Sequence, residues 1–105
     1  MHVTYSERAR DRGVYTISVA AELSGIEPHT LRSYERAGLL TPARSHGGDR
    51  RYSDDDLSRL RHISSLALQG LNLAGIRRVL ELEAENQWLQ AEVETLRGSA
   101  RVEHD

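Results

Sequence analysis

Apolar residues along the chain recur with helical spacing in four segments. The first segment precedes a glycine and contains four apolar residues: Ile17, Val19, Ala20 and Leu23. They predict a short helix with Ser18 as its N-cap and Gly25 in the turn that ends it. Pro28 then predicts the first turn of a second helix, over about 28–37, because proline loses no hydrogen bond there. Two short helices joined by a tight turn are typical of a helix-turn-helix unit.

The next segment indicates a small β-hairpin followed by a third helix. Residues 44–52 flank the turn residues Gly47-Gly48-Asp49, and a hairpin beside a helix-turn-helix unit is a wing. Ser53 predicts the start of the third helix, because it is a good N-cap and an acid, Asp56, follows three residues later. The apolar stripe of this helix consists of Leu57, Leu60, Ile63, Leu66 and Ala67.

The C-terminal segment predicts a long helix with a coiled-coil seam. Gly70 ends the third helix, and Asn72 caps a fourth that runs from Leu73 to about Arg97. A seven-residue register places the seam residues at two core positions: Val79, Asn86 and Val93 at one, and Leu82, Leu89 and Leu96 at the other. Such a seam predicts a homodimer, because the small domain is short of core. Asn86 either sets the register of the seam or lies at a solvated edge. Trp88 belongs to a second stripe, and we interpret it as covering part of the partner's domain.

These elements predict a mainly α fold: a winged helix-turn-helix DNA-binding domain followed by a long C-terminal coiled-coil dimerisation helix. We divide the chain into a flexible N-terminal arm (1–14), the winged domain (15–71), the dimerisation helix (72–97) and a frayed tail (98–105). The arm contains Arg8, Arg10 and Arg12, which either contact DNA or are simply part of a disordered segment.

Composition narrows the classes of function. Across 105 residues the formal net charge is −2, and every one of the 14 basic residues is arginine, whose planar fork suits phosphates and guanine edges. Cysteine is absent, which excludes disulfides and thiolate sites. No histidine has a second ligand at metal-binding spacing, and Asp54–Asp56 suit the positive first turn of a helix. We therefore expect no metal, no cofactor, no catalytic residues and no enzymatic activity. The chain also lacks an apolar run of the ~18–20 residues that span a membrane, so we expect a soluble, cytoplasmic protein associated with the bacterial nucleoid.

Polar residues of the second helix and of the wing are the candidates for DNA contact. His29, Arg32, Ser33 and Arg36 are spaced so that they share one helix face, which would enter the major groove. The alternative is an ordinary solvated face. Tyr34 either donates its hydroxyl to a phosphate or is a core tyrosine with a solvated tip.

The wing contains Arg44, Arg50, Arg51 and Tyr52. Strand alternation places Arg50 and Tyr52 on one face and Arg51 on the other. We therefore expect Arg50 and Tyr52, with Arg44 close by, to contact the phosphate backbone and to govern affinity and its dependence on salt.

Taken together, the motifs resemble the MerR family of transcriptional regulators. The matching positions are Ile17 through Ala21, Gly25-Ile26, Thr30-Leu31-Arg32, Tyr34-Glu35-Arg36, Gly38-Leu39-Leu40, Pro42, Arg44, Gly48, Arg50, Tyr52, Asp56-Leu57 and Leu60. The wing 47–53 and the helix entry 72–76 are most similar to the heat-shock repressor subgroup, HspR. This resemblance implies an antiparallel dimer that represses chaperone genes at an inverted-repeat operator, with an Hsp70-type chaperone as co-repressor. The sequence departs from the family at Ser33, where many members have tyrosine, and at Asp49, where many have an aromatic residue.

Three other functions compete with this interpretation. A MerR-like regulator could control other genes. An excisionase-like architectural protein would carry the same winged motif, but it often lacks a long dimer helix, and the register through Leu96 argues against it. An interaction adaptor would need only the coiled coil, and the clustered arginines of the wing argue against that.

Overall fold

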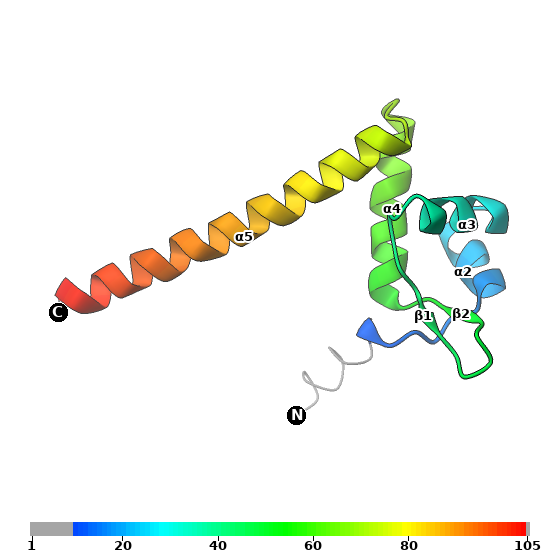
Figure 1. Ribbon diagram of the computed structural model, residues 1–105, viewed down its shortest axis with the longest axis horizontal. Coiled ribbons are helices and arrows are strands. Elements are labelled where there is room, and N and C mark those ends of the chain that lie inside the picture. The colour runs from blue at the N-terminus through cyan, green and yellow to red at the C-terminus, as the bar shows by residue number, and fades with distance from the viewer. Residues whose placement is uncertain (1–9, 105) are drawn as a thin grey trace.

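The computed structural model describes residues 10–104. Its helices are α2 (Ile17–Ser24), α3 (Pro28–Arg36), α4 (Asp54–Leu68) and α5 (Leu73–His104), and its two short strands are β1 (Ala43–Arg44) and β2 (Arg50–Arg51). Helices α2 to α4 and the hairpin form a head, from which α5 extends as a single rod (Figure 1). The predicted fold class is confirmed: the protein is mainly helical, with a helix-turn-helix unit, a two-stranded wing and a long C-terminal helix.

Most helix ends follow the predicted capping residues. Pro28 occupies the first turn of α3, and Ser53 forms a capping box with Asp56 at the start of α4. Asn72 accepts a hydrogen bond from the Gly75 amide (2.8 Å) at the start of α5. The predicted cap of α2 is wrong. Thr16, in extended conformation, caps this helix by accepting from the Val19 amide, so Ser18 lies inside the first turn.

The core of the head lies where α2, α3 and the loop before the wing meet α4 and the start of α5. The buried apolar residues are Ala20, Ile26, Leu31, Leu39, Leu40, Tyr52, Leu57, Leu60, Ile63, Leu66, Ile76 and Leu80. The predicted stripe of α4 is confirmed from Leu57 to Leu66. Ala67 is exposed instead, because packing against the core ends with Leu66, one residue earlier.

The wing is an antiparallel pair in which Ala43 faces Arg51 and Arg44 faces Arg50. The chain before α2 joins it, because the Tyr15 amide donates to the Tyr52 carbonyl (2.9 Å) and the Tyr52 amide donates to the Tyr15 carbonyl (2.7 Å). A Cβ at Gly13 would lie 2.6 Å from the Arg51 carbonyl oxygen, so only glycine fits there without a shift. The end of the predicted arm is thus part of the head. Residues 1–9, including Arg8, lie outside the described residues.

Helix α5 packs on the head only through its first turns. Ile76 and Leu80 are buried and Val79 is half-buried, whereas every residue from Glu81 to Arg101 is exposed. The predicted end at Arg97 is wrong, because the helix continues to His104. A single glycine such as Gly98 costs a helix only about 1 kcal/mol, and no proline follows it. No helix within residues 10–104 is both long and apolar enough to cross a membrane.

Candidate nucleic-acid interface

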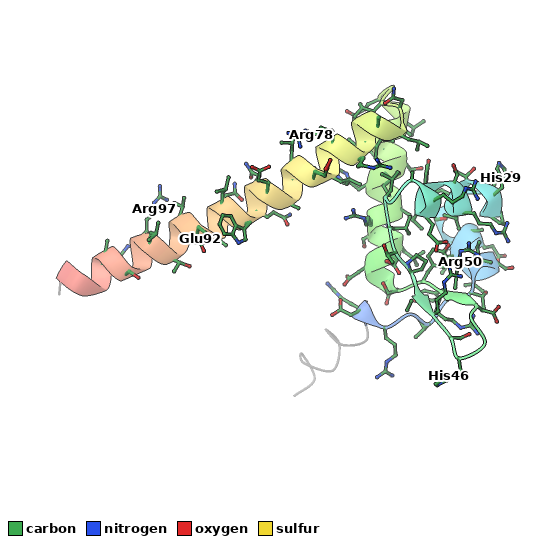
Figure 2. The ribbon with its side chains drawn as sticks, in the orientation of Figure 1. His29, His46, Arg50, Arg78, Glu92 and Arg97 are labelled. Atoms are coloured by element: carbon green, nitrogen blue, oxygen red, sulfur yellow. The ribbon has the colours of Figure 1, made fainter. Side chains whose placement is uncertain are left out.

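Helix α3 presents a polar face to solvent, and a buried leucine on its opposite face packs into the core. Leu31 is fully buried in the core, while His29, Arg32 and Arg36 are exposed and Ser33 is half-buried. His29 lies at the outer end of α3 (Figure 2), where its Nδ1 is 3.7 Å from a carboxylate oxygen of Glu27. Three of the four residues that we expected to share a face are therefore exposed and the fourth is half-buried, on a helix that the buried Leu31 packs against the core.

Tyr34 occupies an intermediate position on the same helix. Its side chain is half-buried and packs against the hydrophobic core. This placement agrees with a core tyrosine that keeps part of its surface in solvent, which is one of the two interpretations that the sequence left open.

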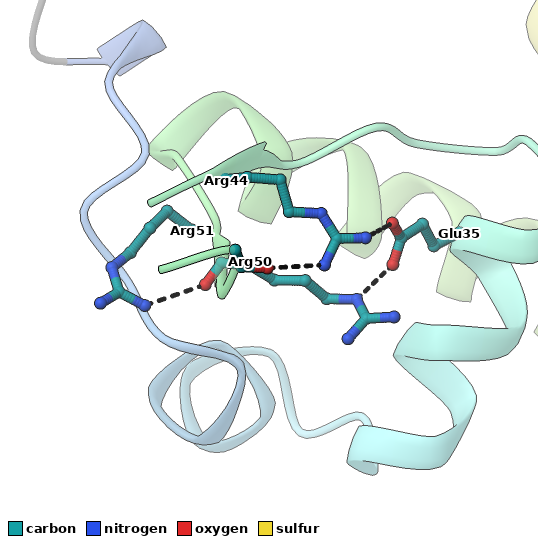
Figure 3. A network of polar contacts seen from close by, with 5 residues as sticks. Glu35, Arg44, Arg50 and Arg51 are labelled. Carbon is teal, nitrogen blue, oxygen red and sulfur yellow. Dashed lines mark hydrogen bonds and ion pairs between the residues drawn. The ribbon is translucent and has the colours of Figure 1, made fainter. Parts of the chain in front are cut away.

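The wing arginines converge on a carboxylate that the sequence analysis missed. Arg44 donates from Nη2 to Glu35 Oε2 at 2.7 Å, and Arg50 donates from Nε to Glu35 Oε1 (Figure 3). Arg44 also donates from Nη1 to the Gly48 carbonyl at 3.3 Å. The hydrogen bond with Glu35 raises the pKa of Arg50 above its ordinary value. A single carboxylate from α3 thus binds one arginine from each strand of the wing.

Arg51 lies on the other face of the wing, as strand alternation predicts. It donates from Nη1 to the Arg50 carbonyl at 3.2 Å and is half-buried. Figure 3 shows its guanidinium directed away from the group formed by Glu35, Arg44 and Arg50.

The expected role of Tyr52 at the phosphate backbone is wrong. Its side chain is fully buried, and its hydroxyl has no hydrogen-bond partner among the described residues. Burial raises the pKa of this phenol, which therefore stays neutral. Alternation correctly places Tyr52 opposite Arg51, but the Tyr52 side chain belongs to the core cluster, which includes residues of α4 and against which Tyr15 packs.

A hollow of about 310 Å³ lies between the wing, α3 and the start of α2. Its lining includes four arginines: Arg32 from α3 and Arg44, Arg50 and Arg51 from the wing. Thr16, Ile17, Gly48 and Asp49 complete it. Asp49 is exposed at the rim, and its backbone closes the hairpin through hydrogen bonds with Ser45. The lining has four arginines and one acid, Asp49. Glu35 offsets one further positive charge, so cationic groups still outnumber acids around the hollow, which suits an anionic ligand such as a phosphate.

Two arginines from other helices fix the chain that leaves α3. Arg59 of α4 donates from Nε to the Leu39 carbonyl at 2.5 Å, and Arg77 of α5 donates to the Ala37 carbonyl. Sequence spacing could not identify these contacts, because they join residues 20 and 40 positions apart. They join the C-terminal end of α3, and the residues that follow it, to α4 and α5.

The expected dimer seam forms an exposed apolar stripe on α5. Leu82, Leu89, Val93 and Leu96 are 45%, 48%, 43% and 66% exposed. A hollow of about 590 Å³ lies where the seam meets α4, and it is lined by Val79, Leu82, Asn86 and His62 among others. His62 Nε2 lies 2.8 Å from Glu83 Oε1 and joins the two helices at this point. Trp88, on the neighbouring stripe, is 62% exposed.

The family model and the relatives that this chain resembles all belong to one family. Residues 15–83 match the MerR HTH family regulatory proteins. A Streptomyces coelicolor protein that bears the name HspR, a heat shock protein, is 51% identical over 86 residues, which are 81% of this chain and 57% of that protein. The Bacillus anthracis HTH-type transcriptional regulator GlnR is 37% identical over 77% of this chain and 62% of its own length. The chain therefore spans about three fifths of the length of these relatives.

A solved structure extends the likeness to the fold. The MerR family regulator HiNmlR, which lacks the sensor domain and was crystallised bound to promoter DNA, superposes with a TM-score of 0.63 at 33% identity, covering 84% of this chain and 72% of that one. These relatives are regulators and not enzymes. Because the family match extends from Tyr15, just before α2, into α5, this chain belongs to the MerR family of DNA-binding transcriptional regulators.

Proposed function

We propose that this protein is a repressor that binds an inverted-repeat operator as a homodimer, with α3 in the major groove and the wing on the phosphate backbone. The observation that carries this proposal is the hollow between α3 and the wing, which Arg32, Arg44, Arg50 and Arg51 line together. A helix and a hairpin that share one cationic hollow can engage base edges and the adjacent phosphates at the same time.

The diameter of a helix supports the placement of α3 in the groove. An α-helix with its side chains is about 10–12 Å across, and the major groove of B-DNA is about 12 Å wide and admits one helix. Arg32 lies in the middle of the exposed face and also lines the hollow. It is therefore the side chain that can serve either a guanine edge or a phosphate, depending on how deeply the helix enters.

The exposed seam of α5 supports a homodimer. A helix that leaves its apolar stripe in water gains stability by pairing, and none of the described residues covers this stripe from Leu82 to Leu96. In an antiparallel pair, Val79 would face Leu96 of the second copy, Leu82 would face Val93, and Asn86 would face Leu89. All six seam residues then have a partner, and the two-fold symmetry of the dimer requires an inverted-repeat site.

The likeness to HspR supports a role in the heat-shock response. We propose that the target genes encode chaperones and that an Hsp70-type chaperone acts as co-repressor. Mapping the bound genomic sites tests the first point, and sites that lie away from chaperone genes would contradict it.

Selection from a randomised DNA library tests the DNA-binding proposal. We expect the wild type to select an inverted repeat whose half-sites are one or two helical turns apart. If Arg32 reads a base, Arg32→Ala weakens binding by about 1–3 kcal/mol per half-site and relaxes the preference at one symmetric pair of positions. If Arg32 binds a phosphate, affinity falls equally for all operator variants.

A matched variant controls for the loss of a positive charge. Arg61 is exposed on α4, in a hollow that also contains Asp54 and Asp55, and Arg61→Ala should leave selection unchanged. Binding by Arg32→Ala that is as strong and as selective as that of the wild type would show that α3 does not read the operator.

A further inference from the structure

The ion pairs that join the reading helix to the wing place an acid inside the cationic surface that should bind DNA. Glu35 belongs to α3, and its side chain is only 18% exposed. Its two oxygens are occupied separately, one by Arg44 of β1 and one by Arg50 of β2. A carboxylate beside DNA repels phosphates, so its presence here requires a compensating role.

The first consequence of this arrangement is geometric. The hydrogen bond uses the Nε of Arg50, and among the described residues the two Nη groups of Arg50 have no protein acceptor. Figure 3 shows them on the far side of the guanidinium from its backbone. A guanidinium is planar, so a fixed Nε fixes the direction in which both Nη groups can donate. Glu35 therefore sets the donor direction of a wing arginine relative to the helix that carries Glu35.

The second consequence is electrostatic. Arg44 and Arg50 together carry two positive charges, and Glu35 offsets one of them. Each positive charge that neutralises a DNA phosphate strengthens binding to every sequence alike, by release of counterions. The carboxylate therefore weakens sequence-independent attraction while it improves the alignment of the remaining donors.

We infer that Glu35 is a specificity-determining positioning residue, which locks the wing arginines to the reading helix and limits binding to non-operator DNA. This inference rests on the proposed function. The inference predicts the direction of two changes. Removing the negative charge of Glu35 should strengthen binding to non-operator DNA and weaken discrimination between sequences. A residue with only a structural role would weaken both kinds of binding together.

The test compares Glu35→Gln with the wild type on two DNA duplexes of equal length: the operator that the wild type selects, and a scrambled sequence of the same composition. The amide replaces one of the two acceptor oxygens with an NH2 donor, so it cannot keep both of the present contacts. It also removes the negative charge that offsets one arginine, so one cation per protomer is released. We expect affinity for the scrambled duplex to rise about three- to tenfold and its salt dependence to steepen by up to about one unit per protomer. The ratio of operator to scrambled affinity should fall about tenfold.

Two further variants separate charge from geometry. Glu35→Asp keeps the charge but is too short to span both arginines, so scrambled-duplex affinity should stay near the wild-type value while the ratio falls. Glu81→Gln removes the same charge from an exposed position on α5 and should change neither quantity. Circular dichroism of each variant checks that the head is folded.

The outcomes distinguish this inference from the proposed function. A wild type that selects no sequence would overturn both. A wild type that selects an operator, with a folded Glu35→Gln whose affinity ratio is unchanged or whose scrambled-duplex affinity falls, would overturn only the role of Glu35.

Discussion

Replacing Leu89 by alanine should weaken the dimer by an amount that follows from its exposure on α5. Leu89 lies near the middle of the seam and is 48% exposed in the single chain. Burying a whole leucine side chain contributes about 1.5–3 kcal/mol relative to exposing it, so burying this half contributes about 1 kcal/mol. The dimer contains the residue twice, and Leu89→Ala should therefore cost about 2 kcal/mol of association free energy.

This loss corresponds to an increase in the dimer dissociation constant of about 30-fold. Sedimentation equilibrium over a range of protein concentrations measures that constant directly. Leu68 supplies the matched control, because it is 89% exposed at the C-terminal end of α4 and lies outside the seam. Leu68→Ala should leave the constant unchanged.

Two results would refute the reasoning. If the wild type remains monomeric at tens of micromolar, on the order expected for a weak interface, the seam does not mediate dimerisation. If Leu89→Ala and Leu68→Ala weaken a dimer equally, the interface lies elsewhere on the molecule or includes the α4–α5 corner.

Two stability predictions follow from the wing and from the cap of α4. Tyr52→Phe removes a buried hydroxyl that has no partner, so the free energy of unfolding in urea should rise by about 1 kcal/mol. DNA affinity should not change, and a large loss of affinity would show that Tyr52 contacts the phosphate backbone after all. Ser53→Ala removes one half of the capping box and should lower the free energy of unfolding by about 1 kcal/mol. The control Ser65→Ala, at an exposed position inside α4, should not lower it; equal effects of the two substitutions would show that the cap contributes nothing.

Local features of the sequence predicted the elements because the interactions that start and end helices are themselves local. Ser53 bonds to the amide three residues ahead, and so does Asn72. The same locality explains the error at the first helix: Thr16 and Ser18 can both cap, and only the backbone conformation at Thr16 decides between them.

The site was harder to predict because its contacts are distant along the chain. Glu35 lies 9 residues from Arg44 and 15 from Arg50, and no spacing rule connects them. One sequence signal was present: an acid beside the basic reading face at Arg32 and Arg36 must either repel DNA or be paired. For Tyr52, strand alternation predicted the face of the hairpin on which its side chain lies. It could not predict which of the two faces the core covers.

In the proposed dimer, helix α5 also constrains the distance between the two heads. Ile76 is buried in the head, so it marks where each head attaches to α5. In the antiparallel pair that brings Val79 opposite Leu96, Ile76 lies opposite residue 99 of the second copy. The two attachment points are then separated by the rise of the intervening helix, about 35 Å at 1.5 Å per residue. One turn of B-DNA is about 34–36 Å, which matches this separation of the attachment points. Of the two spacings expected for the operator, one helical turn is therefore the one that the length of the seam favours.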